Sequence, residues 1–257
     1  FFVGWTLVRG MDPDVAYTEK PMELAFINSI LRSPTFPPHD PWLSGYAISY
    51  YYFGYVVIAM LAKLSGAASA VAFNLSSALW FAMTAAALYG VVFDILKHWI
   101  TKRKKEDLPA QVKFARNGAF LAPLFVLITS TLEGLLEILH AGGIFWKTDA
   151  GGVYTSRFWS WLSILDLDQP PILPFDWIPS RSGGWLWWRG SRVIQDLTLG
   201  NQHVEVIDEF PFFSYLLSDL HPHVLAMPFA ILAIGVSLNF LLGVESFHGK
   251  FNGIFEW

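Results

Sequence analysis

The chain has 257 residues, of which 54% are hydrophobic, 17% aromatic and 15% charged, and its formal net charge is −4. The charged fraction is well below the roughly 25% that is usual for soluble domains, so the composition indicates an integral membrane protein. The chain contains no cysteine, which excludes a disulfide framework, a thiol nucleophile and a zinc site built from thiolates.

Three stretches of mainly apolar residues are long enough to cross a bilayer, for which a helix needs about 20 residues. They are Ala70–Leu96, Gly118–Leu139 and Val224–Val244. Residues 1–9 are also mainly apolar and precede Met11, so they predict a first span that is cut short, and we expect the chain to be a fragment of a longer protein. The sequence therefore predicts an all-α, polytopic integral membrane protein.

The loop after the first span, residues 10–69, opens with three acids: Asp12, Asp14 and Glu19. Beside lipid of low dielectric constant, carboxylates can have raised pKa values and can serve as a general base or as a metal ligand. These three acids are our candidate catalytic residues. A solvated loop that ends a helix is the alternative interpretation.

The rest of this loop is first amphipathic and then aromatic. Residues 21–33 form an amphipathic segment, and a proline-rich turn that carries His39 and Asp40 follows. The run Tyr50–Tyr55 leads into an apolar helix at Ile48–Leu64, and aromatic rings gather where hydrocarbon meets water. We predict that this helix lies along the outer leaflet or dips into it without crossing. As a full span it would separate the acids before it from those of the later long loop.

A short basic loop sets the predicted topology. Residues 97–116 hold seven Lys or Arg against two acids, which places this loop in the cytoplasm by the positive-inside rule. Residues 10–69 and 140–222 then face the outside of the plasma membrane. A nucleic-acid-binding patch is the alternative, but a single basic loop between two apolar helices is nearly always a topology signal. We therefore expect no nucleic-acid partner.

The long loop 140–222 holds seven of the twelve tryptophans, and nine acids against five Lys or Arg. Proline and glycine interrupt it, which predicts loops and short interfacial helices. Its last helix should end before Pro222, because a residue that precedes proline is disfavoured in helical geometry. Asp219, His221 and His223 alternate, and in extended backbone such residues point to one side, where they could converge on a metal ion or a phosphate oxygen. A helix start broken by proline is the alternative.

Motifs along the chain resemble those of the YYY family, prokaryotic polytopic membrane proteins named for their tyrosine run and without an established activity. The matching motifs are Arg9, Asp12-Pro13-Asp14, Thr18–Met22, Phe36–Leu43, Tyr50–Tyr55, Ala72–Leu75, Glu209–Phe213 and Asp219–His223. The resemblance covers nearly the whole chain, and it implies further spans after the last residue of this sequence.

More distantly, the layout is similar to that of GT-C glycosyltransferases. Those enzymes have an acid just after the first span, a long external loop with helices on the membrane, and polyprenyl-phosphate sugar donors. This resemblance rests on architecture, which is an associational argument. It implies a GT-C-like fold.

The resemblance implies a membrane glycosyltransferase that moves a sugar from a polyprenyl-phosphate donor to an acceptor at the outer face. Asp14 or Asp12 would take the proton of the acceptor hydroxyl, and Glu19 is the third candidate. Cationic side chains would offset charge on the departing phosphate, and tyrosines would flank the lipid tail unless they serve only as an interface belt. The candidate substrate-binding residues are Lys20, Arg32, His39, Asp40, Tyr50, Tyr51, Tyr52, Glu209 and His221. The candidate ligands of a divalent metal ion are Asp14, Asp219, His221 and His223.

Two alternatives remain open. The chain could be a non-catalytic subunit of a larger membrane complex that docks through its Trp-rich loop. It could also be a transporter, for which the only hint is Glu133 and Glu137, four residues apart in a predicted span, because intramembrane acids are costly and usually functional. The transferase hypothesis predicts that Asp12–Lys20 and Asp219–His223 meet in one external pocket.

Overall fold

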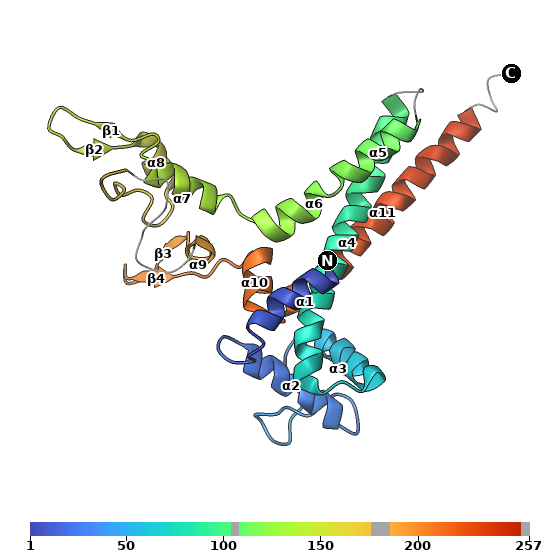
Figure 1. Cartoon of the computed structure of the whole chain (residues 1–257). Coiled ribbons are helices and arrows are strands. Elements are labelled where there is room, and N and C mark those ends of the chain that lie inside the picture. The colour runs from blue at the N-terminus through green and yellow to red at the C-terminus, as the bar shows by residue number, and fades with distance from the viewer. Residues whose placement is uncertain (104–107, 176–185, 253–257) are drawn as a thin grey trace. The chain divides into compact units, whose positions relative to one another are not determined.

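A computed structural model describes residues 1–103, 108–175 and 186–252, and most of these residues are helical (Figure 1). The chain divides into two compact units. The first unit comprises Phe1–Ile128 and Ser214–Trp257, and the second unit comprises Thr129–Phe213. The described part of the first unit is built from helices, as predicted, whereas the second unit also contains two small antiparallel sheets.

The first unit begins with three short helices: α1 (Phe2–Met11), α2 (Lys20–Arg32) and α3 (Phe53–Ser65). Residues of α2 that are three or four positions apart form its buried face, among them Phe26 and Ile30. Phe26 lies under the tyrosine run, with its ring centroid 5.7 Å from that of Tyr55 in α3. The amphipathic segment predicted at residues 21–33 is therefore the helix that packs against α3.

Helix α3 begins five residues later than the helix predicted at Ile48–Leu64. It has 13 residues, fewer than the roughly 20 that cross a bilayer. Its place along the outer leaflet stays a prediction. Gly54 allows α3 to approach α11 closely, since a Cβ atom there would lie 2.4 Å from Leu225 Cδ1.

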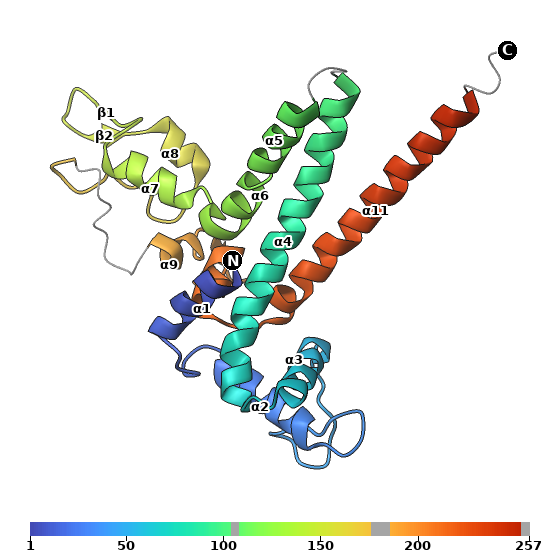
Figure 2. The same ribbon diagram turned by 45° about the vertical axis from the view of Figure 1, so that its right-hand side comes forward.

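Three helical stretches of the described chain are long and apolar enough to cross a membrane. The first, Ser69–Ile100, lies in α4 (Ser69–Arg103), and the third, Pro222–Gly243, lies in α11 (Pro222–Asn252). Both agree with the predicted spans. Helices α4 and α11 meet where α11 begins and separate toward its other end (Figure 2).

The second candidate span, Pro109–Thr129, begins and ends earlier than the predicted Gly118–Leu139. It comprises α5 (Leu108–Gly118), α6 (Leu121–Pro123) and a π-helix (Leu124–Thr129). The helix stops because Ser130 has a φ of 58°, in the left-handed region. The predicted boundary was wrong because apolar residues continue across this break.

The predicted basic loop, residues 97–116, is mostly helical. Helix α4 continues to Arg103 and α5 begins at Leu108, since Lys and Arg are good helix formers and extend both ends. Lys104 and Lys105 lie outside the described residues. The cytoplasmic position of residues 97–116 stays a prediction.

Aromatic side chains hold α1 and α10 against α4. The rings of Trp5 and Phe81 stack with centroids 3.9 Å apart, and the edge of Tyr215 meets Phe81 at 5.2 Å. The Tyr215 hydroxyl lies 2.9 Å from that of Thr84 in α4. Trp80 of the same helix donates to the carbonyl of Leu225 at 2.9 Å, which fixes the first turn of α11.

The second unit is built from short elements. They are α7 (Glu133–Ala141), β1 (Lys147–Thr148), β2 (Tyr154–Thr155), α8 (Arg157–Leu162), α9 (Leu186–Gly190), β3 (Gln195–Leu197) and β4 (His203–Glu205). Helix α10 (Pro211–Leu217) runs across the boundary between the two units. Fully buried Trp159 donates to the carbonyl of Ile144, and Leu167 is buried with it. The short helices were predicted, but the two hairpins were not.

Candidate functional site

Thr18 and Glu19 of the first loop meet the junction between α10 and α11 within the first unit, where the sequence predicts that Asp12–Lys20 and Asp219–His223 lie together. Thr18 Oγ1 donates to Asp219 Oδ1 at 2.5 Å, although the two residues are 201 positions apart. Beside this bond, Glu19 Oε2 lies 2.9 Å from His221 Nε2. A carboxylate and an imidazole from distant parts of the sequence thus form a contact pair.

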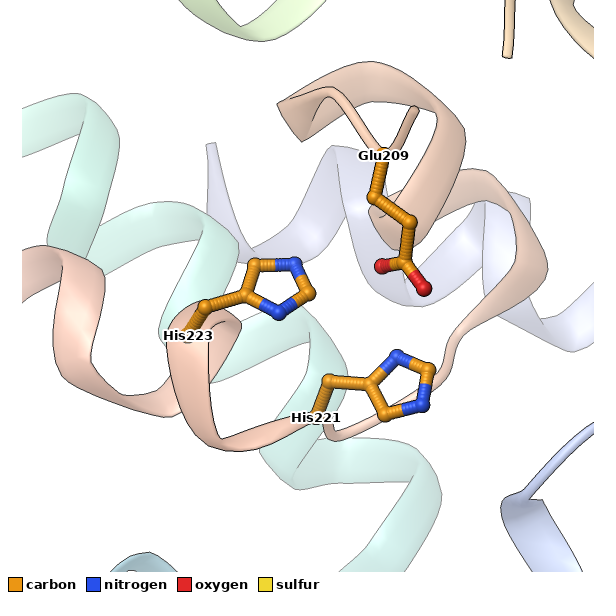
Figure 3. A group of neighbouring side chains, drawn as sticks. All are labelled: Glu209, His221 and His223. Atoms are coloured by element: carbon orange, nitrogen blue, oxygen red, sulfur yellow. The ribbon is translucent and has the colours of Figure 1, made fainter. Parts of the chain in front are cut away.

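The junction places these side chains because it is not helical. Helix α10 ends at Leu217, Ser218 has a φ of 61°, and α11 begins at Pro222, as the sequence predicts. Proline fits the first position of a helix because its missing N–H would have no partner there. The rings of His221 and His223 stack at the start of α11, with centroids 5.6 Å apart (Figure 3).

The side chain of Glu23 in α2 anchors the main chain of the junction. Its Oε2 accepts a hydrogen bond from the backbone N–H of Leu220 at 2.8 Å, directly between Asp219 and His221. The side chain of Glu23 is fully buried, and this burial raises its pKa to about 8, against the lowering effect of the Leu220 N–H. Burial, together with the nearby Glu23, also raises the pKa of Tyr55.

Glu23 was not among the predicted site residues. It lies on the buried face of α2, four residues before buried Ile27. An acid at the apolar spacing of an amphipathic helix is the signal that could have identified it.

Arg9 and Asn74 hold the backbone of the loop that contains Asp12 and Asp14. The buried Arg9 side chain donates to the carbonyls of both aspartates, at 2.8 Å for Asp14, and to Asn74 Oδ1 at 2.5 Å. Asn74 in turn donates to the carbonyl of Pro13 at 3.1 Å. The segments around Asp12-Pro13-Asp14 and Ala72–Leu75 therefore have a structural role. Both aspartates are exposed, and the acid that contacts the junction is Glu19.

The candidate substrate-binding residues of the proline-rich turn have local roles. Asp40 Oδ1 accepts hydrogen bonds from the N–H groups of Trp42 and Leu43, both at 2.8 Å. His39 pairs with Ala47 in an isolated β-bridge, and its carbonyl accepts a hydrogen bond from Ser29. These contacts close the turn on itself and explain both residues without a ligand.

The tyrosine run is divided between packing and exposure. Tyr50 packs on Phe26 with ring centroids 5.5 Å apart, and Tyr52 directly precedes α3. Tyr51 is 79% exposed, so it is the member of the run most accessible to a lipid.

The remaining candidates lie in different surroundings. Lys20 is buried at the start of α2, whereas Arg32 is exposed at its end. Glu209, also labelled in Figure 3, is exposed and belongs to the second unit, so we do not assign it to this site. Asp219 accepts from Thr18 and His221 contacts Glu19, so the first-loop partners orient both side chains. A metal ion held by these residues together with Asp14 and His223 stays a prediction.

Glu133 and Glu137 are not part of a candidate span, contrary to the prediction. They lie in α7, beyond the break at Ser130, and both are buried in the second unit. Both oxygens of Glu137 accept hydrogen bonds from Arg189, from Nε at 2.5 Å and from Nη2 at 2.7 Å. This acceptor raises the pKa of Arg189. The ion pair gives buried Glu137 a structural role in the second unit.

The comparisons with known proteins place the chain at the level of a family. Residues 1–250 match the model of a family described as "Uncharacterized membrane protein (DUF2298)". Neither a curated protein nor a solved structure matches the chain. The family match supports the predicted insertion in a lipid bilayer, but it contains no link to GT-C glycosyltransferases. Because the match spans nearly all of a chain with three candidate spans, this protein belongs to that family of uncharacterised membrane proteins.

Proposed function

We propose that this protein is a membrane transferase of the GT-C type. It moves a sugar from a polyprenyl-phosphate donor to an acceptor hydroxyl at the outer face of the plasma membrane. The contact of 2.9 Å between Glu19 and His221 carries the proposal, because it joins two titratable groups at the start of α11, where a membrane-bound donor can reach them. If Glu19 and His221 served only as helix caps, neither would need a titratable partner.

In this reaction the acceptor oxygen attacks the anomeric carbon of the donor, and the bond between that carbon and the phosphate oxygen breaks. The proton of the acceptor hydroxyl passes to Glu19, whose side chain is 50% exposed. His221 is 12% exposed and can donate from Nε2 to Glu19, which orients the carboxylate as the third group of a catalytic triad orients its base. The leaving phosphate takes the electron pair of the broken bond.

The geometry ranks the other candidates around this pair. Lys20 follows Glu19 in sequence, whereas Arg32 lies about 18 Å away along α2 at 1.5 Å per residue. Lys20 is therefore the α2 cation that would offset phosphate charge. Asp12 and Asp14 are alternative bases, held nearby by Arg9 through their main chains.

The proposal predicts that Glu19→Gln lowers turnover of polyprenyl-phosphate mannose or glucose by about 10²–10⁴, the usual contribution of a general base. The full chain is reconstituted in vesicles, and release of polyprenyl phosphate is measured. Asp149→Asn is the matched control, because it also replaces an acid by its amide, but in the second unit. Asparagine keeps a side-chain oxygen that can accept the hydrogen bonds from the N–H groups of Gly151 and Val153.

Two results would contradict this function. One is a wild-type chain that releases no polyprenyl phosphate. The other is release of polyprenyl phosphate that neither Glu19→Gln nor Asp14→Asn lowers, because the proposed bases would then have no part in the reaction. If deletion of the protein alters only the yield of a larger membrane complex, the alternative function, a non-catalytic subunit of that complex, is correct.

A further inference from the structure

The second unit contains a cavity of about 600 Å³ that the proposed transfer reaction does not use. Its volume is within the range of about 300–1,000 Å³ that is usual for small-molecule sites. Side chains from α7, α9 and β4 line it together with residues 164–166 and 192–194, all of them within the second unit. The chemistry of these walls indicates the class of ligand.

The two arginines of the cavity already donate hydrogen bonds to carboxylates of the protein. Arg189 donates two hydrogen bonds to Glu137. The guanidinium of Arg192 lies 3.5 Å from the ring centroid of Trp188 and also donates to Glu205. An anionic ligand would have to displace these acceptors before it could bind.

Carboxylates outnumber guanidiniums among the described residues that line the cavity. The four acids are Glu133, Glu137, Asp166 and Glu205, and the only described arginines are the two above. Asp166 is exposed, so its charge is accessible to a ligand. The four acids and two arginines leave a formal excess of negative charge along the described lining of the cavity.

Apolar residues also line the cavity. They are Ile164, Leu165, Val193, Ile194 and Val204. A ligand that suits both kinds of lining residue has a hydrocarbon body and a single positive charge. The four acids do not form a group of ligand atoms close enough to hold one metal ion, within the residues that the structure describes.

We propose that this cavity binds a small organic cation, a primary amine or guanidinium on an apolar body, with Asp166 as a main partner of the charge. The apolar lining residues take the hydrocarbon part, as in other small-molecule sites. This site is independent of the Glu19–His221 pair and of any sugar transfer.

The test compares three probes of equal shape and different charge: benzylamine, benzyl alcohol and benzoate. The full chain is held in nanodiscs, and binding is followed by saturation-transfer NMR. Benzylamine should bind at least about tenfold more tightly than benzyl alcohol, which corresponds to about 1.4 kcal/mol. Benzoate should not bind measurably.

Two variants locate the charge that binds the probe. Asp166→Asn should weaken benzylamine binding at least about threefold, since it removes one charge of the cavity. Asparagine also tolerates the φ of 65° at this position, so the fold is kept. Asp149→Asn removes a charge outside the cavity lining and should leave binding unchanged. Glu205→Gln, on the β4 side, is a second cavity variant.

Three results would overturn the proposal. They are binding of benzoate as tight as that of benzylamine, equal binding by the Asp166→Asn and Asp149→Asn variants, and no saturable benzylamine binding up to about 10 mM, a generous limit for so small a ligand. The assay contains no lipid-linked sugar. A failure here is therefore distinct from a failure of the proposed transferase activity.

Discussion

Glu137 in the second unit is 3% exposed and accepts two hydrogen bonds from Arg189, whereas Glu19 in the first unit is 50% exposed and has one contact with His221. Both are acids that pair with a cation-forming side chain far away in the sequence. In the buried pair the partner occupies both carboxylate oxygens, so the pair stabilises the fold. In the other pair the side chain of Glu19 is half exposed, which suits the proton transfer that we propose for it.

The buried ionisable groups of the first unit bind mostly to main-chain atoms. Glu23 accepts from the N–H of Leu220, and Arg9 donates to the carbonyls of Asp12 and Asp14. Such bonds fix the path of two loops without using the side chains of those loops. The difference between the units teaches that burial and the number of bonds, rather than charge alone, separate a structural acid from a candidate catalytic one.

The largest expected effect comes from breaking the buried pair. Glu137→Gln should lower the free energy of unfolding by about 3 kcal/mol, because the guanidinium of Arg189, whose side chain is 13% exposed, loses the charged acceptor of two hydrogen bonds, although Glu133 and Asp166 stay near it. Glu19→Gln should lower it by less than about 1 kcal/mol, since an exposed pair is screened by solvent. Denaturant unfolding of both variants in the same detergent measures the difference. Equal losses for the two variants would remove the distinction between the pairs.

A second effect should appear as pH dependence at Glu23. The folded state raises the pKa of Glu23 from 4.5 to about 8, so folded protein keeps a proton that the unfolded chain releases. Stability should therefore fall as pH rises from about 4.5 to about 8, by a few kcal/mol in total, since one pKa unit corresponds to about 1.4 kcal/mol. Asp219 and Glu19 favour the protonated form of Glu23, and His221 opposes it.

Glu23→Gln tests this dependence because glutamine keeps an acceptor oxygen for Leu220 and does not titrate. Melting temperatures between pH 5 and pH 8 should decline less steeply in Glu23→Gln than in the unchanged protein. Asp149→Asn should keep the original slope. A Glu23→Gln variant with an unchanged slope would show that Glu23 is ionised in the folded protein.

The sequence allowed the long elements and the meeting of distant segments to be predicted. Hydropathy located α4 and α11, and the break before Pro222 marked the junction that contacts the first-loop acids. Hydropathy could not locate the end of the second span, because apolar residues continue past Ser130 and only a left-handed φ interrupts the helix.

Other features depend on contacts that no local pattern encodes. Arg189 meets Glu137 across 52 residues, so the pattern of two acids in an apolar stretch was read as intramembrane. The two hairpins have strands of two or three residues, too short for a visible alternation of polar and apolar positions. Glu19 was among the candidate catalytic residues, but Asp12 and Asp14 were placed first because they match the acid that follows the first span in GT-C enzymes. In the structure Arg9 binds the carbonyls of both aspartates.

The smallest expected effect on stability tests whether the strength of an ion pair depends on its burial or on the unit in which it lies. Arg192 and Glu205 form an ion pair in the second unit, as Arg189 and Glu137 do, but the side chain of Glu205 is 63% exposed. Glu205→Gln should therefore change the free energy of unfolding by only about 0.2–1 kcal/mol, the range of exposed pairs. Arg192 would keep its position over Trp188, which does not depend on the carboxylate. Denaturant unfolding beside Glu137→Gln gives the comparison, and a loss near 3 kcal/mol would mean that the second unit stabilises every ion pair strongly, whatever its exposure.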